Sequence, residues 1–155
     1  MEGRPRDHGV AETPKIVVDA SVAVRWFTSE EFSDEARLLE QRYETRRLDL
    51  LAPNLLLYEL GNALRDNPGF GIEEVTRALR DLEDLQLTLY YLEGELKRLS
   101  ALLAFTHGLS FYDSAYVALT VAARSVFFTA DEEVVRRVSK PFVKHIRGLG
   151  EEMGQ

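Results

Sequence analysis

The sequence contains no cysteine, and histidine, tryptophan and methionine are all scarce among its 155 residues. The absence of cysteine excludes disulfide bonds and thiolate-held metal ions, and it agrees with a protein of the reducing cytoplasm. The three histidines are scattered at His8, His107 and His145, which argues against a histidine-held zinc ion. A metal site in this chain is therefore expected to use oxygen ligands.

Long hydrophobic runs are also absent, and none reaches the length of a membrane-spanning helix. Residues 1–13 are polar and lack the apolar segment of a signal peptide. The composition, with 45% hydrophobic and 29% charged residues, is typical of a globular domain. We expect a cytoplasmic protein with a flexible extension over 1–13, one domain over 14–148 and a disordered tail over 149–155.

Positive charge is the third deficit, because the formal net charge is −7. Proteins that bind nucleic acid non-specifically are usually basic. Any nucleic-acid contact must therefore depend on a metal ion, a basic partner or local groups of cationic residues. Such groups lie in three predicted helices: Arg42, Arg46 and Arg47; Arg77 and Arg80; and Arg136, Arg137 and Lys140.

Short apolar segments alternate with helical patterns along the chain. Strands are predicted over 15–19, 48–52, 87–92, 125–129 and 141–146. Helices are predicted over 20–27, 28–47, 53–67, 72–84, 93–107, 112–123 and 130–139. The second of these helices starts from the capping-box pattern of Thr28 with Glu31, and Pro53 suits the first position of the third. The strands are continuously apolar, which indicates an α/β fold: one small parallel sheet of about five strands with helices on both faces.

Four acidic residues occupy positions where functional groups gather in such a fold, at the carboxyl ends of the strands. Asp19 ends the first predicted strand, and Asp131 closely follows the fourth. Asp113 opens the almost uncharged helix that leads into the fourth strand. Glu59 interrupts an apolar helical segment. All four side chains are expected to meet at one edge of the sheet.

Each acid also has a structural explanation. Asp19 and Asp113 are placed where they could cap helices, Asp131 lies within the capping-box pattern of Thr129 with Glu132, and Glu59 could pair with Arg25 or Arg65. However, no lysine or arginine neighbours the aspartates at contact spacing. Converging carboxylates without cations repel one another and raise their pKa values. A hard divalent ion removes that repulsion, so the four acids predict a Mg²⁺ or Mn²⁺ site.

Four segments, 17–22, 58–62, 110–116 and 129–131, carry these acids in order along the chain. They resemble the successive motifs of PIN-domain proteins, and most closely those of the VapC toxins of prokaryotic toxin–antitoxin pairs. The resemblance extends from Lys15 to about Arg147. It implies a small parallel sheet between helices, and a metal-dependent endoribonuclease that hydrolyses RNA with metal-activated water.

The resemblance also assigns roles by motif position. It implies a catalytic, metal-binding quartet: Asp19, Glu59, Asp113 and Asp131. It implies three supporting polar residues: Ser21, Asn62 and Thr129. Two residues are expected at the rim in contact with substrate: Arg25 and Trp26. The implied partners are RNA, a VapB-like antitoxin and a second copy of the chain in a homodimer.

Other functions fit the sequence less well. A receiver-like phosphoacceptor domain needs paired acids after the first strand and an aspartate ending the third, yet Asp19 has no acidic neighbour and 87–92 ends at Glu93. A haloacid-dehalogenase-like phosphatase needs a second acid where Ser21 stands. The remaining alternative is a PIN-like module that binds a partner without catalysis, and metal binding distinguishes it from the enzyme.

Overall fold

The structure, a computed structural model, describes residues 12–149. A single parallel sheet has the strand order β3-β2-β1-β4-β5. Its strands are β1 Lys15–Val18, β2 Asp49–Pro53, β3 Thr88–Tyr90, β4 Val126–Thr129 and β5 Val143–His145. The predicted α/β class and five-stranded parallel sheet are confirmed.

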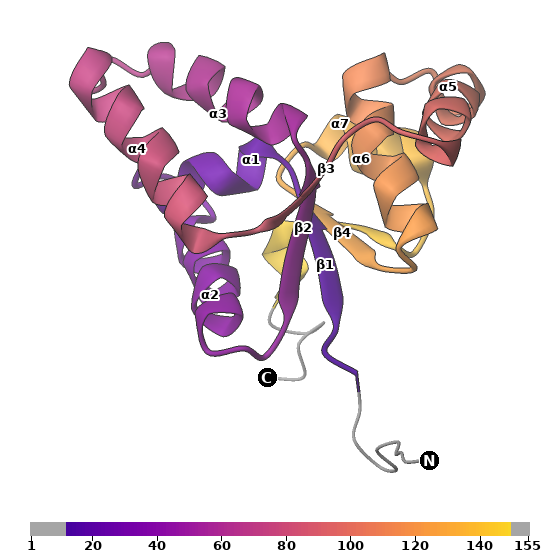
Figure 1. The fold of residues 1–155 in the computed structure, drawn as a ribbon, viewed down its shortest axis with the longest axis horizontal. Coiled ribbons are helices and arrows are strands. Elements are labelled where there is room, and N and C mark those ends of the chain that lie inside the picture. The colour runs from indigo at the N-terminus through magenta and orange to yellow at the C-terminus, as the bar shows by residue number, and fades with distance from the viewer. Residues whose placement is uncertain (1–11, 150–155) are drawn as a thin grey trace.

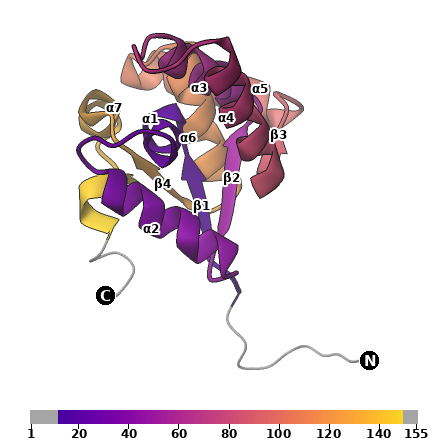
Figure 2. The ribbon, with the colours of Figure 1, turned by 90° about the vertical axis from the view of Figure 1, so that its left-hand side faces the viewer.

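Helices cover both faces of the sheet, as predicted. They are α1 Ala20–Ala23, α2 Ser33–Glu44, α3 Leu55–Arg65, α4 Ile72–Leu85, α5 Glu95–His107, α6 Phe111–Ala122 and α7 Glu132–Val138, with short 3₁₀ turns at Val24–Trp26 and Ile146–Gly148. Figure 1 shows α1 to α4 on one side of the strands and α5 to α7 on the other. Figure 2 looks onto the first side, where α2 lies in front of the strands.

The core is centred on the three inner strands. Val17, Val18 and Phe128 have no exposed surface, because a central strand covered on both faces buries every side chain. Helix α6 packs against β1, β2 and β4, and its residues 116–120 are buried. The nearly uncharged sequence of α6 is therefore explained by its position within the core.

Two predicted helix starts are wrong. Pro53 does not open a helix but ends β2, opposite Tyr90 of β3, and α3 begins at Leu55. Thr28 does not cap α2, which begins only at Ser33 after a left-handed residue. The Thr28 hydroxyl instead donates to the carbonyl oxygen of Val24 at 3.0 Å, so it closes the preceding turn.

The domain extends one residue beyond its predicted end, because Leu149 is completely buried in the core. Most of the predicted extension (1–11) and tail (150–155) lies outside the described residues. No helix within 12–149 combines the length and apolar character needed to cross a membrane.

The core predicts a large stability difference between two phenylalanines. Phe128 is fully buried in β4, whereas Phe105 of α5 is 91% exposed. Phe128→Ala should lower the free energy of unfolding by about 3–5 kcal/mol through lost burial and the cavity left behind. Phe105→Ala should change it by less than about 0.5 kcal/mol. Urea unfolding of both variants measures the difference, and equal losses would contradict this arrangement of the core.

Candidate acidic active site

The four predicted acids line one open pocket of about 480 Å³ at the carboxyl edge of the sheet. The sheet order explains this convergence. The chain leaves β1 towards β2 on one side and returns to β4 on the other, so a crevice opens beyond β1 and β4. Its lining comes from the start of α1, the exposed side of α3, the start of α6 and the turn before α7: Asp19, Ala20, Ser21, Leu55, Tyr58, Glu59, Asn62, Ala63, Tyr112, Asp113 and Asp131.

Asp19 is the most buried of the four acids, with 8% of its surface exposed. Its Oδ1 accepts hydrogen bonds from the backbone N–H of Ser21 at 3.1 Å and from the Ser21 hydroxyl at 2.6 Å. Its Oδ2 accepts from the Thr129 hydroxyl, also at 2.6 Å. Both carboxylate oxygens are therefore held by neutral donors, and no cation contributes.

The same two hydroxyls connect the ends of β1 and β4. Ser21 Oγ accepts from the backbone N–H of Ala130 at 2.8 Å, and Thr129 Oγ1 accepts from that of Asp131 at 3.0 Å. The two hydroxyl oxygens lie 3.2 Å apart. Ser21 and Thr129, predicted as supporting residues, thus fix the turn after β4 relative to Asp19.

Asp131 combines a structural contact with its place in the pocket. It is the N-cap of α7, and its Oδ1 accepts from the backbone N–H groups of Glu133 and Val134. Asp19 likewise caps α1. The capping explanation is therefore correct for Asp19. At α7 the N-cap is Asp131 itself, so the predicted capping box starting at Thr129 is wrong. Both carboxylates still line the pocket.

Asp113 is not a cap. Ser110 is the N-cap of α6, and its hydroxyl accepts from the backbone N–H of Asp113 at 3.0 Å. Asp113 occupies the first turn, where the partial positive charge of the helix end favours a carboxylate. Its side chain is therefore left to line the pocket.

Glu59 is held by a residue that the sequence analysis did not assign to the site. The hydroxyl of Tyr116, in α6, donates to Glu59 Oε1 at 2.7 Å. Tyr116 is 1% exposed and stacks on Phe127 of β4, with ring centroids 5.8 Å apart. The sequence signal was its spacing, because Tyr116 lies three residues after Asp113 on the same side of a helix.

The alternative ion pair of Glu59 is not formed among the described residues. Arg25 contacts Glu30 at 3.4 Å, and Arg65 contacts Asp66 at 3.5 Å. Both arginines are thus engaged by nearer acids. The Glu59 carboxylate has a neutral partner instead.

The pKa values show how the acids act on one another. Burial raises the pKa of Asp19 to about 6, and the Glu59 carboxylate adds to this rise. Burial also raises the pKa of Glu59, with a further contribution from Asp113. Burial and then the charge of Asp131 raise the pKa of Asp113. The four carboxylates therefore form a chain of repulsive neighbours.

This donor set fits a hard divalent cation. Mg²⁺ and Mn²⁺ prefer carboxylate oxygens, and a cation would reverse the repulsion that raises these pKa values. Within 12–149, however, no three acidic or histidine side chains stand close enough to enclose an ion as they are placed. The pocket is open, so binding would require the carboxylates to move inward.

The two predicted substrate contacts at the rim are not supported. Trp26 is buried, and its indole N–H donates to the carbonyl oxygen of Ala36 at 2.8 Å, so it belongs to the core. Arg25 donates to the carbonyl oxygens of Glu31 and Ser21, which fixes the end of α1. Neither residue lines the pocket. Tyr58 and Tyr112, neighbours of two of the acids, border it instead.

Comparison with known proteins agrees with this geometry. A family model of the PIN domain matches residues 16–141. The chain belongs to the PIN domain family. Among curated proteins, it is similar to ribonuclease VapC3 of Pyrobaculum aerophilum, with 32% identity over 128 residues that cover 79% of this chain and 94% of that protein.

Solved PIN-domain relatives share the fold at low sequence identity. PAE2754 from Pyrobaculum aerophilum is 20% identical with a TM-score of 0.66, covering 96% of this chain and 95% of that one. VapC20 of Mycobacterium tuberculosis, described as a sarcin-ricin loop cleaving toxin, is 13% identical with a TM-score of 0.61 over 78% and 93%. VapBC2 from Rickettsia felis, bound to promoter DNA, is 12% identical with a TM-score of 0.59, covering 84% of this chain and 96% of that one.

The Tyr116 contact predicts a shift in the titration of Glu59. The hydroxyl stabilises the charged carboxylate, so Tyr116→Phe should raise the pKa of Glu59 further. Carboxyl ¹³C NMR over a pH series measures this change. Tyr58→Phe is the matched control, because Tyr58 neighbours Glu59 but is 77% exposed. An unchanged Glu59 titration in Tyr116→Phe would show that the hydrogen bond does not form in solution.

The raised pKa of Asp19 predicts a pH-dependent stability. The folded state holds the Asp19 proton up to about pH 6, whereas the unfolded chain releases it near the ordinary value of 3.8. The folded state thus binds more protons between these values, and stability is lost as the pH rises through them. Relative to Asp19→Asn, the wild type should lose roughly 2 kcal/mol between pH 4 and 7.

Urea unfolding in EDTA at several pH values tests this prediction. Asp81→Asn, which removes an exposed carboxylate of α4, is the control and should follow the wild type. A constant difference between the wild type and Asp19→Asn over this range would contradict the raised pKa.

Proposed function

We propose that the protein is a metal-dependent endoribonuclease and the toxin of a VapBC-type toxin–antitoxin pair. One observation carries the proposal: four carboxylates line a single pocket at the crevice of a PIN-domain sheet, and no described cation pairs with them. Because paired charges are the usual way to stabilise buried acids, their absence favours a site that receives a cation from solution.

The relatives support the chemistry. The curated relative is named a ribonuclease, and one solved relative is described as a toxin that cleaves the sarcin-ricin loop. Others are a toxin–antitoxin complex from Klebsiella pneumoniae and VapBC2 from Rickettsia felis. By this similarity we propose RNA as substrate, a VapB-like antitoxin as partner and a homodimer as the assembled form.

Asp19, Glu59, Asp113 and Asp131 would hold one or two Mg²⁺ or Mn²⁺ ions. When bound, such an ion lowers the pKa of a coordinated water and neutralises charge on the scissile phosphate. The acids themselves act as ligands. Their position is set by neighbours, because hydrogen-bonded partners orient metal-binding groups.

Three hydroxyls provide this support. Ser21 and Thr129 fix both oxygens of Asp19, and Tyr116 fixes one oxygen of Glu59. Asn62 lines the pocket from α3, one helical turn after Glu59. These neutral donors orient the acids without neutralising them, which leaves their charge available to a cation.

The acidic pocket also constrains substrate binding. Without a cation, four carboxylates repel the phosphodiester that must enter the pocket. The proposed enzyme should therefore bind RNA weakly in EDTA. The rival function, a PIN-like module that binds a partner without catalysis, requires neither the metal nor the convergence of the acids.

Metal binding is the first test of the proposal. Isothermal calorimetry at neutral pH should detect Mn²⁺ and Mg²⁺ binding to the wild type. Asp113→Asn should weaken the affinity at least tenfold, because it removes a charged ligand. Asp81→Asn on α4 should bind as the wild type does. If the wild type binds neither ion at millimolar concentration, the partner-binding module is the better explanation.

Cleavage is the second test. The wild type with Mn²⁺ should cut a random-sequence RNA pool, and EDTA should stop the reaction. Asp19→Asn should reduce the rate by at least about a hundredfold, while Asp81→Asn should keep it. Metal binding without cleavage of either the random-sequence pool or total cellular RNA would favour the partner-binding module.

A further inference from the structure

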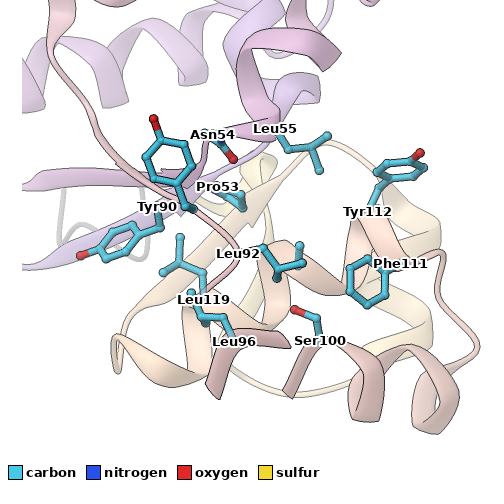
Figure 3. Close-up of a pocket in the computed structure, with 12 residues that line it drawn as sticks. Pro53, Asn54, Leu55, Tyr90, Leu92, Leu96, Ser100, Phe111, Tyr112 and Leu119 are labelled. Carbon is cyan, nitrogen blue, oxygen red and sulfur yellow. The ribbon is translucent and has the colours of Figure 1, made fainter. Parts of the chain in front are cut away.

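A second cavity of about 180 Å³ lies beside the acidic pocket (Figure 3). Leu55 and Tyr112 line both cavities, so the two are adjacent. Its walls come from the end of β2, the segment after β3, and the facing sides of α5 and α6. They are almost entirely apolar or aromatic, and four aromatic rings take part: Tyr90, Tyr91, Phe111 and Tyr112.

One polar group in this cavity lacks a partner. Ser100 of α5 is completely buried, and its Oγ has no hydrogen-bond partner among the described residues. Figure 3 shows Ser100 with the side chains of Leu92, Leu96 and Phe111 around it. A buried hydroxyl without a partner destabilises a protein by about 1–3 kcal/mol. A ligand whose hydrogen-bonding edge reached Ser100 Oγ would remove this penalty.

The volume of the cavity and the character of its walls further limit which ligands could bind. The cavity is smaller than the roughly 300–1,000 Å³ of typical small-molecule sites, so it suits a single ring system. Aromatic walls favour a flat ring that can stack on them. An aliphatic side chain from a partner protein would fill the space but leave Ser100 unpaired. A nucleobase has both a flat face and a polar edge.

We propose that this cavity binds one nucleobase of the RNA, flanking the phosphate held in the acidic pocket. The proposal rests on the proposed nuclease function for the identity of the ligand. The rim supports it, because Tyr91 and Tyr112 are 66% and 61% exposed and available to stack on a base. The acidic pocket would hold the backbone, and this cavity would select the sequence.

Nucleoside binding tests the cavity without cleavage. The four uncharged ribonucleosides are titrated into ¹⁵N-labelled protein in EDTA, so that neither phosphate nor metal contributes. Amide shifts should concentrate at Tyr91, Leu92 and Ser100, and one or two bases should bind best. Ser100→Ala should weaken the preferred base about five- to tenfold, because it removes one hydrogen bond. Absence of shifts at these residues with every nucleoside would overturn the proposal.

Two alanine variants test whether aromatic stacking contributes to nucleoside binding. Tyr91→Ala removes an aromatic ring of the cavity and should weaken nucleoside binding about tenfold. Phe105→Ala removes a still more exposed ring of α5 that does not line the cavity, and it should have no effect. Equal effects of the two variants would show that the nucleosides bind the surface non-specifically.

Cleavage separates this proposal from the nuclease itself. In the random RNA pool, Ser100→Ala should relax the base preference at one position next to the cut. Phe105→Ala, outside the cavity, should leave both that preference and the cleavage rate unchanged. Cleavage with an unchanged preference would overturn the base-binding cavity and leave the nuclease intact. Nucleoside binding without any cleavage would support the cavity and contradict the nuclease.

A second copy of the chain is the competing occupant. If it fills the cavity, the amides of Tyr91, Leu92 and Ser100 should shift with protein concentration, in parallel with dimer formation in sedimentation experiments. That result, together with loss of nucleoside shifts in the dimer, would overturn the proposal.

Discussion

The site depends on a buried carboxylate held without a cation. Asp19 lies at the junction of β1 and β4, and hydroxyls from Ser21 and Thr129 occupy both of its oxygens. These hydrogen bonds lower its pKa, yet burial outweighs them and the pKa rises to about 6. The fold thus keeps an acid where its charged form is unfavourable. A cation supplied from solution would remove that penalty, which makes metal binding and folding stability two measures of one interaction.

The other acids follow from this arrangement. Parallel pairing of β1 with β4 brings the turn that carries Asp131 beside Asp19, and α6 presents Asp113 from the opposite face. Glu59 completes the group from α3. Glu59 raises the pKa of Asp19, Asp113 raises that of Glu59, and Asp131 raises that of Asp113, so neutralising one acid should lower the pKa of the neighbour it acts on. The quartet therefore behaves as one electrostatic unit, and a single substitution tests more than one ligand position.

The sequence was sufficient for the sheet and the convergence of the acids, because both depend on patterns along the chain. Continuous apolar segments marked the strands, and acids following them marked the crevice. It was insufficient where tertiary contacts decide. Proline is suited both to the start of a helix and to the end of a strand. Only the pairing of Pro53 with Tyr90 of β3 shows that it ends β2. Trp26, next to the first motif, was expected to contact substrate, but its indole N–H donates to the carbonyl oxygen of Ala36 in the core. The spacing of Tyr116 from Asp113 indicates its side of the helix, but its hydrogen bond to Glu59 joins residues 57 positions apart, so no local pattern identifies that partner.

Under the proposed function, the two neighbouring cavities would recognise different parts of the RNA because they differ in physical character. The acidic pocket repels phosphate until a cation is present, so its affinity for RNA is conditional and independent of sequence. The aromatic cavity carries no charged side chain. Its buried unpaired hydroxyl, Ser100 Oγ, would hydrogen-bond to the polar edge of a base. Base selection would then persist without metal, whereas backbone binding would not. Because Leu55 and Tyr112 border both cavities, a base bound in one would fix where the adjoining phosphate enters the other. In a chain with a net charge of −7, uncharged stacking is the interaction best able to supply affinity that repulsion does not cancel.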